Sequence, residues 1–395
     1  MRFDDSYIPA PLLWSSPFIR WQGRAADVSS LDLAVQVTRD AMAARGFDAA
    51  EVQQLVFGST VPQTHSFYAA PWLAARLGMA EVGGPTVSQA CATAVACIAT
   101  AAAANGLSGG QTQLVVTADR TSNGPLLVYP RSAAMGGSPV TQNWVLDSFA
   151  ADPCTGESMV HTAEATARDG GFTRQACDDL TLLRHAQYQN ALRDDRAIQK
   201  RYLQPIVIEQ RKSRLVLDQD EGVSPYSAEG LAALKPALPG GVVTPGAQTH
   251  PADGAAGAVV TNRETAQRLA NGQGTVKLVS AGFARAEKGR MPKAPALAAQ
   301  RALQSAGLAM AEVKVVTTHN PFAVNDLWFS QATGFALEQM NPLGCSLIYG
   351  HPQAPTGLRA IAELAEALRI AGGGVGLFAG CAAGDMGAAL VVLVE

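Results

Sequence analysis

The sequence predicts an α/β protein made of two similar halves with an inserted segment between them. Strand-like and helix-like segments alternate over residues 1–120 and again over residues 271–395. The second alternating region repeats features of the first at a nearly constant offset. Residues 121–250 break the alternation. We therefore expect an N-terminal half at 1–120, completed by about 251–270, an inserted segment at 121–250 and a C-terminal half at 271–395.

Composition and charge are those of a soluble globular protein. The 395 residues exceed one ordinary domain, 48% are hydrophobic and 16% are charged. The net charge of −3 implies no general affinity for nucleic acid or acidic membranes. The six cysteines lack the spacing of disulfide frameworks or metal sites, which predicts a reducing compartment. We see neither a signal sequence nor an apolar run of membrane-spanning length, so we expect a cytoplasmic protein.

The first half begins its alternation with a helix at 30–45, for which Ser30 is a candidate cap. The apolar run at 52–60 predicts a buried strand. Residues 68–78 form a helical pattern that ends at a glycine. Residues 112–119 predict a further strand of the same sheet.

A cysteine stands where a strand passes into a helix in the stretch TVSQACATAVACIATAAAANG, residues 86–106. The strand pattern ends near Val87, and a helix of small apolar residues starts at Ala92. Cys91 therefore lies near the first turn, where free N–H groups favour an anion and lower a thiol's pKa. The alternative is that Cys91 is a small buried hydrophobic residue. Cys97 is expected to belong to the core.

The inserted segment at 121–250 has three parts. It opens with turn formers, continues over about 160–221 as a charged amphipathic helical stretch followed by SRLVLDQDE, and closes with LPGGVVTPGAQTHPADGAAG. Long insertions in compact enzymes often build the walls of binding sites. The alternative is a surface cap without a function.

The second half repeats the order of the first. Its elements are a strand at 275–284, a helix at 294–306, a strand that starts at 313 and ends before His319, a helix at 355–369 and closing strands at 374–380 and 387–395. Glu51 and Glu312 precede corresponding strands 261 positions apart, and Cys91 and His351 occupy corresponding strand-to-helix corners 260 positions apart. Duplicated units pack around a pseudo-twofold axis, so we expect Cys91 and His351 to lie within reach of each other.

Further chemically active side chains follow predicted strands. His319 and Asn320 come directly after one strand, His351 lies between glycine and proline, and Cys381 lies in a loop of small residues. Each alone has a structural explanation, as a turn residue, a cap or a small core side chain. Together they indicate an active site, because catalytic groups in α/β folds lie at the carboxyl ends of strands.

These motifs, in this order and spacing, resemble those of the thiolase family. The likeness extends over most of the chain from about residue 28, including the stretches GESMVHTAEATARDGGFTRQACDDLTLLRHAQ and LAALKPALPGGVVTPGAQTHPADGAAGAVV. The family's fingerprints stand here as Cys91-Ala92-Thr93, His319-Asn320-Pro321-Phe322, Gly350-His351-Pro352 and Cys381-Ala382-Ala383.

The resemblance implies a five-layered αβαβα fold with residues 121–250 as a loop domain that covers a coenzyme A site. It implies an acyltransferase that cleaves 3-ketoacyl-CoA, or makes it by Claisen condensation, through an acyl-enzyme on Cys91. His351 would accept the Cys91 proton, and Cys381 would act as acid and base at the α-carbon. Coenzyme A and acyl-CoA would be substrates, with no permanently bound cofactor and no metal. Family habit favours a homodimer or homotetramer.

The resemblance also assigns supporting residues. The backbone N–H groups of Cys91 and Ala383 would bind the acyl-enzyme oxyanion, and Asn320 is assigned to the same oxyanion group. His319, together with His351 and a water, would polarise that thioester. The substrate or CoA site would include Met159, Gly246, Thr249, Phe322 and Arg214.

The sequence departs from the family pattern at several of these positions. His319 stands where most members have asparagine, and Ala383 where they have glycine. Ser224 stands where many place an arginine for the adenine end, so Arg211, Lys212 or Arg214 would have to substitute. Ser158-Met159 precedes Thr162-Ala163-Glu164, where short-chain synthetic members favour His-Met, so the resemblance implies an altered acyl pocket rather than a dedicated acetoacetyl-CoA enzyme.

Two alternatives stay open. One is a catalytically silent subunit that binds acyl-CoA or a partner protein, although the nucleophile and histidine that such a subunit would lose are present. The other is a condensing enzyme of the ketoacyl-synthase type, which uses one cysteine, so Cys381 counts against it.

Overall fold

Two β-sheets from the two halves of the chain form the centre of the molecule. The structure, a computed structural model, describes residues 1–133, 135–211 and 213–395. The first sheet runs in the order β2 (Leu13–Ser15), β11 (Ala252–Val260), β6 (Gln113–Arg120), β4 (Gln54–Gly58) and β5 (Thr86–Val87), with β3 (Ile19–Arg20) also paired to β11. The second sheet runs in the order β1 (Tyr7–Pro9), β12 (Thr275–Arg285), β15 (Met386–Val394), β14 (Gly374–Ala382) and β13 (Val315–His319).

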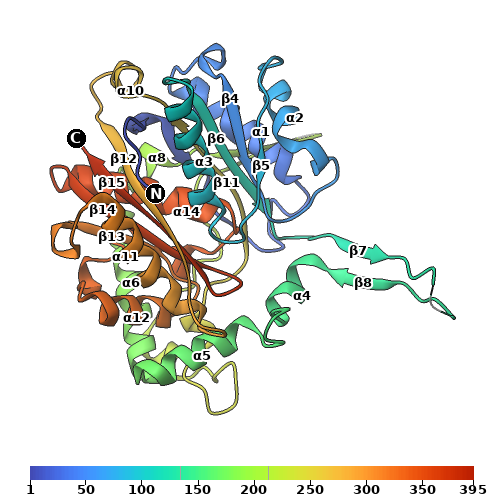
Figure 1. The fold of residues 1–395 in the computed structure, drawn as a ribbon. Coiled ribbons are helices and arrows are strands. Elements are labelled where there is room, and N and C mark those ends of the chain that lie inside the picture. Colours follow the sequence, from blue (N-terminus) through green and yellow to red (C-terminus); the bar gives the residue numbers. More distant parts are fainter. Residues whose placement is uncertain (134, 212) are drawn as a thin grey trace.

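Helices fill the space between the sheets and cover both outer faces (Figure 1). α3 (Thr93–Leu107) and α14 (Pro355–Ile370) lie between the sheets and pack against each other. α1 (Ser30–Ala44) and α2 (Ala69–Arg76) cover the outer face of the first sheet, and α11 (Ala294–Ala306) covers that of the second. The predicted five-layered αβαβα fold is therefore confirmed.

The two middle helices approach each other closely because small residues face one another. A Cβ atom added at Gly357 of α14 would lie 2.7 Å from the Cβ atom of Ala94 in α3, so only glycine fits there. Every residue of α14 from Pro355 to Leu368 is buried. The glycine of the HPQAPTG stretch therefore serves the packing that brings the corners of the two halves together.

The expectation that no apolar run reaches membrane-spanning length was wrong. The 18 residues Ala90–Leu107 have a mean hydropathy of 1.6, so by length and composition they qualify as a membrane span. In the fold, 56% of this stretch is buried, and α3 packs between the two sheets. The core helix of a folded protein passes the same test as a membrane span.

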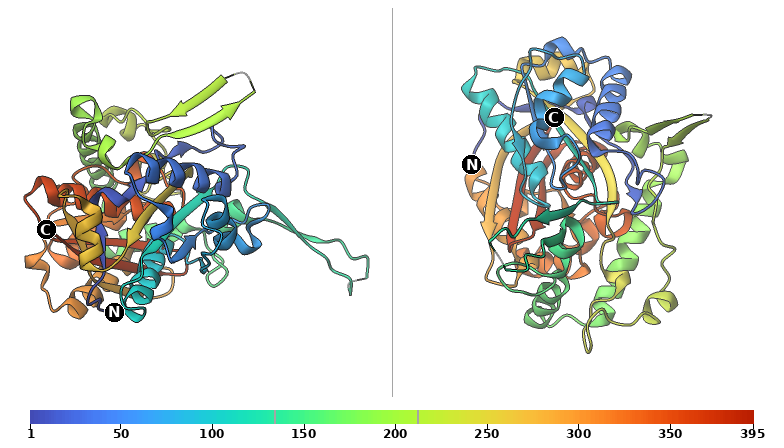
Figure 2. Two further views of the ribbon diagram at one scale, coloured as in Figure 1. Left: turned by 90° about the horizontal axis from the view of Figure 1, so that it is seen from above. Right: turned by 90° about the vertical axis from the view of Figure 1, so that its right-hand side faces the viewer.

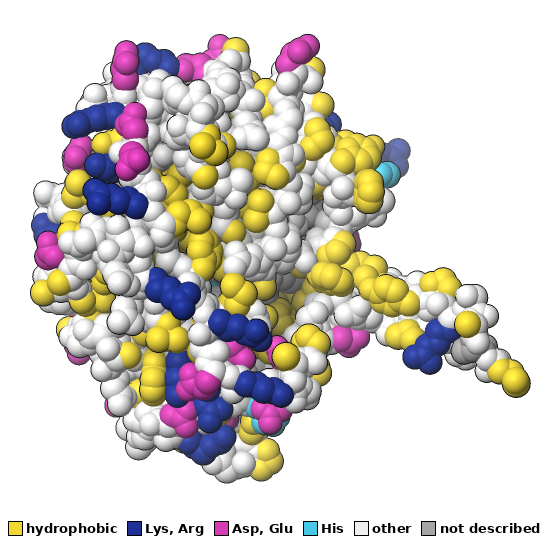
Figure 3. Space-filling view, in the orientation of Figure 1, with side chains coloured by type: hydrophobic (Ala, Val, Ile, Leu, Met, Phe, Trp, Pro, Cys, Tyr) yellow, Lys and Arg dark blue, Asp and Glu magenta, His cyan; other side chains and the backbone are white. Residues whose placement is uncertain are grey.

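The inserted segment forms a long arm and a helical subdomain. The arm consists of β7 (Leu126–Tyr129) and β8 (Val140–Asn143), and it projects far from the body (Figures 1 and 2). Hydrophobic side chains gather along the arm and at its base (Figure 3). The remaining elements of the segment are α4 (Trp144–Ala150), α5 (Met159–Gly170), α6 (Arg174–Ala191), α7 (Arg193–Arg196), α8 (Gln199–Tyr202), the hairpin β9 (Ile206–Gln210) and β10 (Ser213–Leu217), and α9 (Ala228–Ala232).

Buried ion pairs fasten the subdomain to the second half. Arg184 of α6 donates to Asp326 at 2.8 Å, and Arg359 of α14 binds Asp220 through two hydrogen bonds; all four side chains are fully buried. Breaking one partner of such a pair leaves an uncompensated buried charge.

The remaining elements are short or lie at the margins. Ser29, not Ser30, caps α1, because its hydroxyl accepts the N–H of Leu31.

The other elements are α10 (Arg263–Ala270), α12 (Ala323–Thr333), α13 (Ser346–Tyr349) and the 3-10 helices η1 (Ala10–Leu12), η2 (Ala49–Glu51), η3 (Ser66–Tyr68), η4 (Pro245–Ala247), η5 (Met291–Lys293), η6 (Met310–Glu312) and η7 (Leu337–Gln339).

Candidate active site

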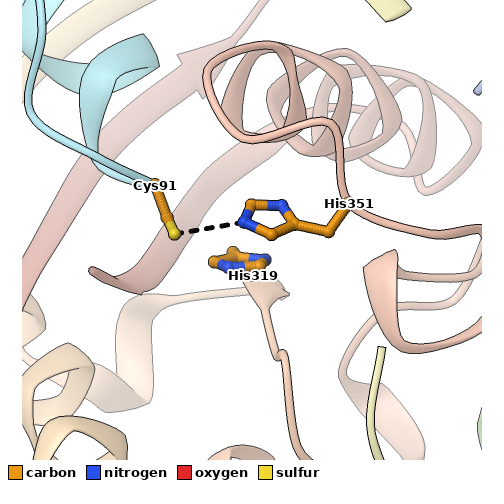
Figure 4. Close-up of side chains that lie close together, drawn as sticks. All are labelled: Cys91, His319 and His351. Atoms are coloured by element: carbon orange, nitrogen blue, oxygen red, sulfur yellow. Dashed lines mark hydrogen bonds between the residues drawn. The ribbon is translucent and has the colours of Figure 1, made fainter. Parts of the chain in front are cut away.

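Cys91 and His351 meet at the junction of the two halves, as predicted. The Sγ atom of Cys91 lies 3.1 Å from Nε2 of His351 (Figure 4). Cys91 follows β5 at the start of α3, and His351 stands at the corresponding corner before α14. The internal repeat therefore placed two residues 260 positions apart in hydrogen-bond contact.

The turn that presents Cys91 is braced by a threonine. Ala90 has a φ of +45°, a left-handed conformation that residues with a Cβ atom rarely adopt. The Thr93 hydroxyl donates to the carbonyl of Ala90 at 2.6 Å and accepts the N–H of Gln89 at 2.8 Å. These bonds explain why a hydroxyl residue follows the cysteine at this spacing.

The corner that presents His351 fixes the orientation of its ring. Gly350 has a φ of +95°, and a Cβ atom there would lie 2.6 Å from the His250 ring, so both conformation and space require glycine. The Thr356 hydroxyl lies 2.6 Å from Nδ1 of His351. Because Nδ1 is held, Nε2 points at the thiol.

His319 stacks on His351 and also lies close to the thiol, since its nearest ring nitrogen is within 4.8 Å of the Cys91 sulfur. The two imidazole rings are stacked with centroids 4.0 Å apart and planes 26° apart (Figure 4). The Ser346 hydroxyl lies 2.8 Å from Nδ1 of His319, while Nε2 has no partner among the described residues. His319 thus presents an unpaired nitrogen close to the reacting pair.

The surroundings of the pair keep both groups neutral. Burial raises the pKa of the Cys91 thiol to about 12, although the backbone N–H groups of Ala383 and Cys91 act in the opposite direction. Burial lowers the pKa of His351 to about 3 and that of His319 well below its ordinary value. The predicted lowering of the thiol pKa was wrong. Burial of the thiolate raises the pKa by more than the N–H groups at the start of α3 lower it. A thiolate must therefore form by proton transfer from Cys91 to His351.

This proton transfer predicts an unusual pH profile for alkylation. The neutral pair and the thiolate–imidazolium pair carry the same number of protons, so their ratio does not change with pH between the two pKa values. We expect the rate of Cys91 alkylation by iodoacetamide to be nearly flat from about pH 5 to about pH 9. In His351→Gln, the rate should be lower at neutral pH and rise with pH, because only the free thiolate remains.

The exposed Cys154 provides an internal comparison in the same samples. Its alkylation, followed by peptide mass spectrometry, should accelerate with pH as its thiolate forms. Parallel profiles for Cys91 and Cys154 would contradict proton transfer within the Cys91–His351 pair.

The second candidate catalytic cysteine, Cys381, is fully buried near the end of β14. Its Sγ atom accepts a hydrogen bond from the Asn325 amide at 3.3 Å. Burial raises the pKa of Cys381 well above its ordinary value, and the nearby Cys91 raises it further. Cys381 is therefore a protonated thiol in the resting protein.

A cavity of about 250 Å³ surrounds the exposed side of Cys91. Its walls include four of the residues that the resemblance assigned to the site: Met159, Thr249, Phe322 and Ala383. The Thr249 hydroxyl donates to the carbonyl of Ser346 at 2.5 Å, which fixes its position at the wall. The cavity is small, and apolar side chains form much of its lining.

Five predicted site residues do not line this cavity: His319 and Cys381, which lie buried behind it, and Asn320, Gly246 and Arg214. The Asn320 amide and carbonyl bond Asp326, Cys345 and Leu347, so its polar atoms serve the scaffold. Gly246 lies in η4, where an added Cβ atom would meet Leu231 at 2.4 Å. Arg214 lies on the β9–β10 hairpin, exposed and 3.4 Å from Glu209. Arg211 is exposed on the same hairpin, and Lys212 lies outside the described residues.

Two contacts of the site were not predicted. The Cys91 thiol donates to Oε1 of Gln353 at 3.2 Å, and Nε2 of Gln353 is buried without a partner among the described residues. Asp119 accepts the N–H of Ala354 at 3.0 Å as well as N–H and hydroxyl groups of residues 59–61, which ties the His351 corner to the loop after β4. Burial raises the pKa of Asp119 to about 6. The position of Gln353, two residues after His351, was the only sequence signal.

Family models match nearly the whole chain. Residues 14–264 match the model described as "Thiolase, N-terminal domain", and residues 273–394 match "Thiolase, C-terminal domain".

Individual relatives agree with these models. The chain is 30% identical to an acetyl-CoA acetyltransferase of Escherichia coli strain K12, over 94% of this chain and 95% of that protein. It is 29% identical to a 3-ketoacyl-CoA thiolase of Serratia proteamaculans strain 568, over 96% and 95%. Among solved structures, an acetyl-CoA acetyltransferase from Syntrophomonas wolfei superposes with a TM-score of 0.91 at 25% identity over 100% of both chains. Human mitochondrial 3-ketoacyl-CoA thiolase in complex with CoA shares the fold at a TM-score of 0.88 and 21% identity, over 99% of this chain and 98% of that one.

Proposed function

Because the chain belongs to the thiolase family, we propose that it transfers acyl groups between Cys91 and coenzyme A and cleaves 3-ketoacyl-CoA to acyl-CoA and acetyl-CoA. The reverse Claisen condensation uses the same groups. The observation that carries the proposal is the 3.1 Å contact between Cys91 Sγ and His351 Nε2 beside the buried Cys381 thiol.

The first step is attack by sulfur on the 3-keto carbon. His351 takes the Cys91 proton, and the sulfur forms a bond to the carbonyl carbon. The oxyanion that develops is stabilised by the backbone N–H groups of Cys91 and Ala383, which already act on the sulfur. One such donor contributes about 3 to 4 kcal/mol to lowering a barrier.

The second step breaks the bond between the α-carbon and the keto carbon. The electron pair of that bond passes to the α-carbon, and the Cys381 thiol supplies the proton that completes acetyl-CoA. A thiol suits this role because it stays protonated in the buried site yet can return the proton in the condensation direction. His319 lies close enough to His351 to help polarise the thioester of the departing acetyl-CoA.

The third step releases the acyl group. The Cys381 thiolate left by the second step takes the proton of a second coenzyme A thiol, whose sulfur attacks the Cys91 thioester. The Cys91 sulfur leaves as a thiolate and regains the proton that His351 has held since the first step. Coenzyme A is thus a substrate, and no residue needs a bound cofactor or metal for these steps.

The direct test supplies 3-ketoacyl-CoA with and without free CoA and follows the products by liquid chromatography and mass spectrometry. We expect acetyl-CoA and the shortened acyl-CoA in equal amounts, only when CoA is present. CoA binding without any product, for all donors, would instead support a silent acyl-CoA-binding subunit.

We also propose that the chain forms a homodimer or homotetramer in the cytoplasm. The arm supports assembly because it exposes large apolar side chains, among them Leu126 at 63% and Val128 at 56%. All six cysteines are free, which fits a reducing compartment. Light scattering coupled to gel filtration measures the assembly, and a monomeric mass would contradict it.

A further inference from the structure

The Cys91 thiol has two hydrogen-bond acceptors within reach. Oε1 of Gln353 lies 3.2 Å from the sulfur, and Nε2 of His351 lies 3.1 Å from it. A thiol has one proton and donates it to one acceptor at a time. The side-chain amide of Gln353 therefore competes with the base for the proton that the first step of the proposed reaction must move.

Once the proton has moved to His351, the contact with Oε1 becomes unfavourable. The thiolate has no proton to donate, so an amide oxygen beside it brings two acceptors together. The other end of the amide has the opposite character, because its nitrogen carries two N–H donors. Nε2 of Gln353 is buried and has no hydrogen-bond partner in the part of the chain that the structure describes. A buried donor without a partner is rare in a folded protein, and this one lies beside a forming anion.

The backbone of Gln353 is held in an unusual conformation. Its φ of +63° is left-handed, where glycine is the ordinary choice and a residue with a side chain is strained. The N–H of the next residue, Ala354, donates to Asp119 at 3.0 Å, and the Gln353 carbonyl accepts the N–H of Thr356 at 3.2 Å. The chain thus keeps a strained glutamine in place beside the sulfur. Strain that is retained in this way is typical of functional residues.

The amide itself is free to turn on this fixed backbone. The last torsion of a glutamine side chain joins a tetrahedral carbon to a planar amide, and its energy profile is broad and roughly two-fold. A half-turn about this bond exchanges the oxygen and the nitrogen. It therefore replaces the acceptor at the Cys91 sulfur by a donor without moving the backbone.

We propose that Gln353 is a catalytic residue whose amide accepts the Cys91 S–H in the resting site, turns when His351 takes the proton, and donates Nε2–H to the thiolate. The amide stays neutral and transfers no proton. It exchanges a neutral hydrogen bond for a charge-assisted one, which is about twice as strong. The catalytic role rests on the proposed function, in which the thiolate forms before attack and again when the sulfur leaves the acyl group. The new bond adds to the backbone N–H groups of Cys91 and Ala383 that already act on the sulfur.

The test measures alkylation of Cys91 by iodoacetamide in the full-length protein at neutral pH, followed by peptide mass spectrometry. Gln353→Gly removes the amide and suits the left-handed backbone, and Gln353→Leu removes the amide but keeps a large side chain. Both variants should alkylate about ten-fold more slowly than the wild type, the scale of losing one hydrogen bond to a charged group.

Gln89→Leu is the matched control for these variants. Gln89 lies two residues before Cys91, but its Nε2 lies 3.9 Å from the Met386 sulfur and makes no bond to Cys91 among the described residues. The control should alkylate at the wild-type rate.

Gln353→Glu gives a pH signature that a purely structural role would not produce. The glutamate side chain keeps the shape and the acceptor, but its carboxyl group donates only while it is protonated. Alkylation of Cys91 in this variant should slow as pH rises through the pKa of the introduced carboxyl group, whereas the wild-type rate should stay nearly flat. The other titratable groups around the sulfur, which are His319, His351, Cys381 and Asp119, are common to both proteins.

Two alkylation results would overturn the inference. One is a rate at or above that of the wild type in both Gln353→Gly and Gln353→Leu. The other is a rate in Gln353→Glu that rises with pH, which would show that the acceptor acts on His351, otherwise kept neutral by burial. Alkylation needs no acyl-CoA, so these results do not depend on turnover.

Turnover tests the catalytic part of the inference separately. Gln353→Gly and Gln353→Leu should each lower kcat for 3-ketoacyl-CoA cleavage about ten-fold and leave KM for CoA unchanged, because the amide acts on the reacting sulfur. An unchanged kcat in both variants would overturn the catalytic role. Absence of turnover in the wild type would instead contradict the proposed function.

Discussion

Replacing Cys91 by serine should abolish acyl transfer. Intact mass spectrometry after brief incubation with acetyl-CoA and with medium-chain acyl-CoA should show one acyl adduct on the wild type and none on Cys91→Ser. The turnover rate should fall by about 10⁴- to 10⁶-fold, the scale of losing a covalent nucleophile. The physical reason is that a serine hydroxyl at this corner has a much higher pKa than a thiol, and His351, itself held neutral by burial, cannot remove its proton.

The exposed Cys154 supplies the control for this experiment. Cys154→Ser should keep both the adduct and the turnover, since the side chain does not line the Cys91 cavity. An adduct that persists on Cys91→Ser would show that another group is the nucleophile.

Replacing Cys381 by serine should separate the two kinds of chemistry in the site. Formation of the Cys91 adduct from acyl-CoA breaks no carbon–carbon bond and needs no acid at the α-carbon, so the adduct should still form. Cleavage of 3-ketoacyl-CoA should fall by about 10²- to 10⁴-fold, the usual contribution of a general acid or base. The exchange of the α-hydrogens of acetyl-CoA with D₂O, followed by mass spectrometry, measures the Cys381 step alone.

Cys381→Ala provides the comparison for Cys381→Ser. Both variants should lose α-hydrogen exchange, and the alanine variant should lose it at least as completely because it has no ionisable proton. Exchange that continues at the wild-type rate in both variants would contradict the assignment of Cys381 and direct attention to His319, whose Nε2 has no hydrogen-bond partner in the part of the chain that the structure describes.

Much of the architecture was predictable from the sequence because it depends on local patterns and on an internal repeat. The period of apolar residues predicted α11 at its observed bounds, 294–306, and the strand and helix on either side of Cys91. The repeat predicted that Cys91 and His351 would meet, since equivalent corners of duplicated halves face each other across their axis.

The placement of individual side chains was less predictable. Asn320 follows His319 directly, yet its amide points into the scaffold, because buried polar atoms must find partners and Asp326 and Leu347 provide them. The charge of Arg214 predicts a contact with coenzyme A, but the two strands of the β9–β10 hairpin pair with each other and hold this side chain away from the cavity.

The sequence by itself determined the fold class and the pairing of the two halves, and it predicted the reacting groups, because periodicity, repetition and residue chemistry are local properties of the chain. Only the tertiary structure decided the ionisation of Cys91, its contact with Gln353 and the shape of the cavity beside it. Desolvation, hydrogen-bond geometry and cavity shape arise from residues distant in sequence that pack together. For that reason the strand-to-helix pattern predicted the position of Cys91 correctly but the direction of its pKa shift wrongly.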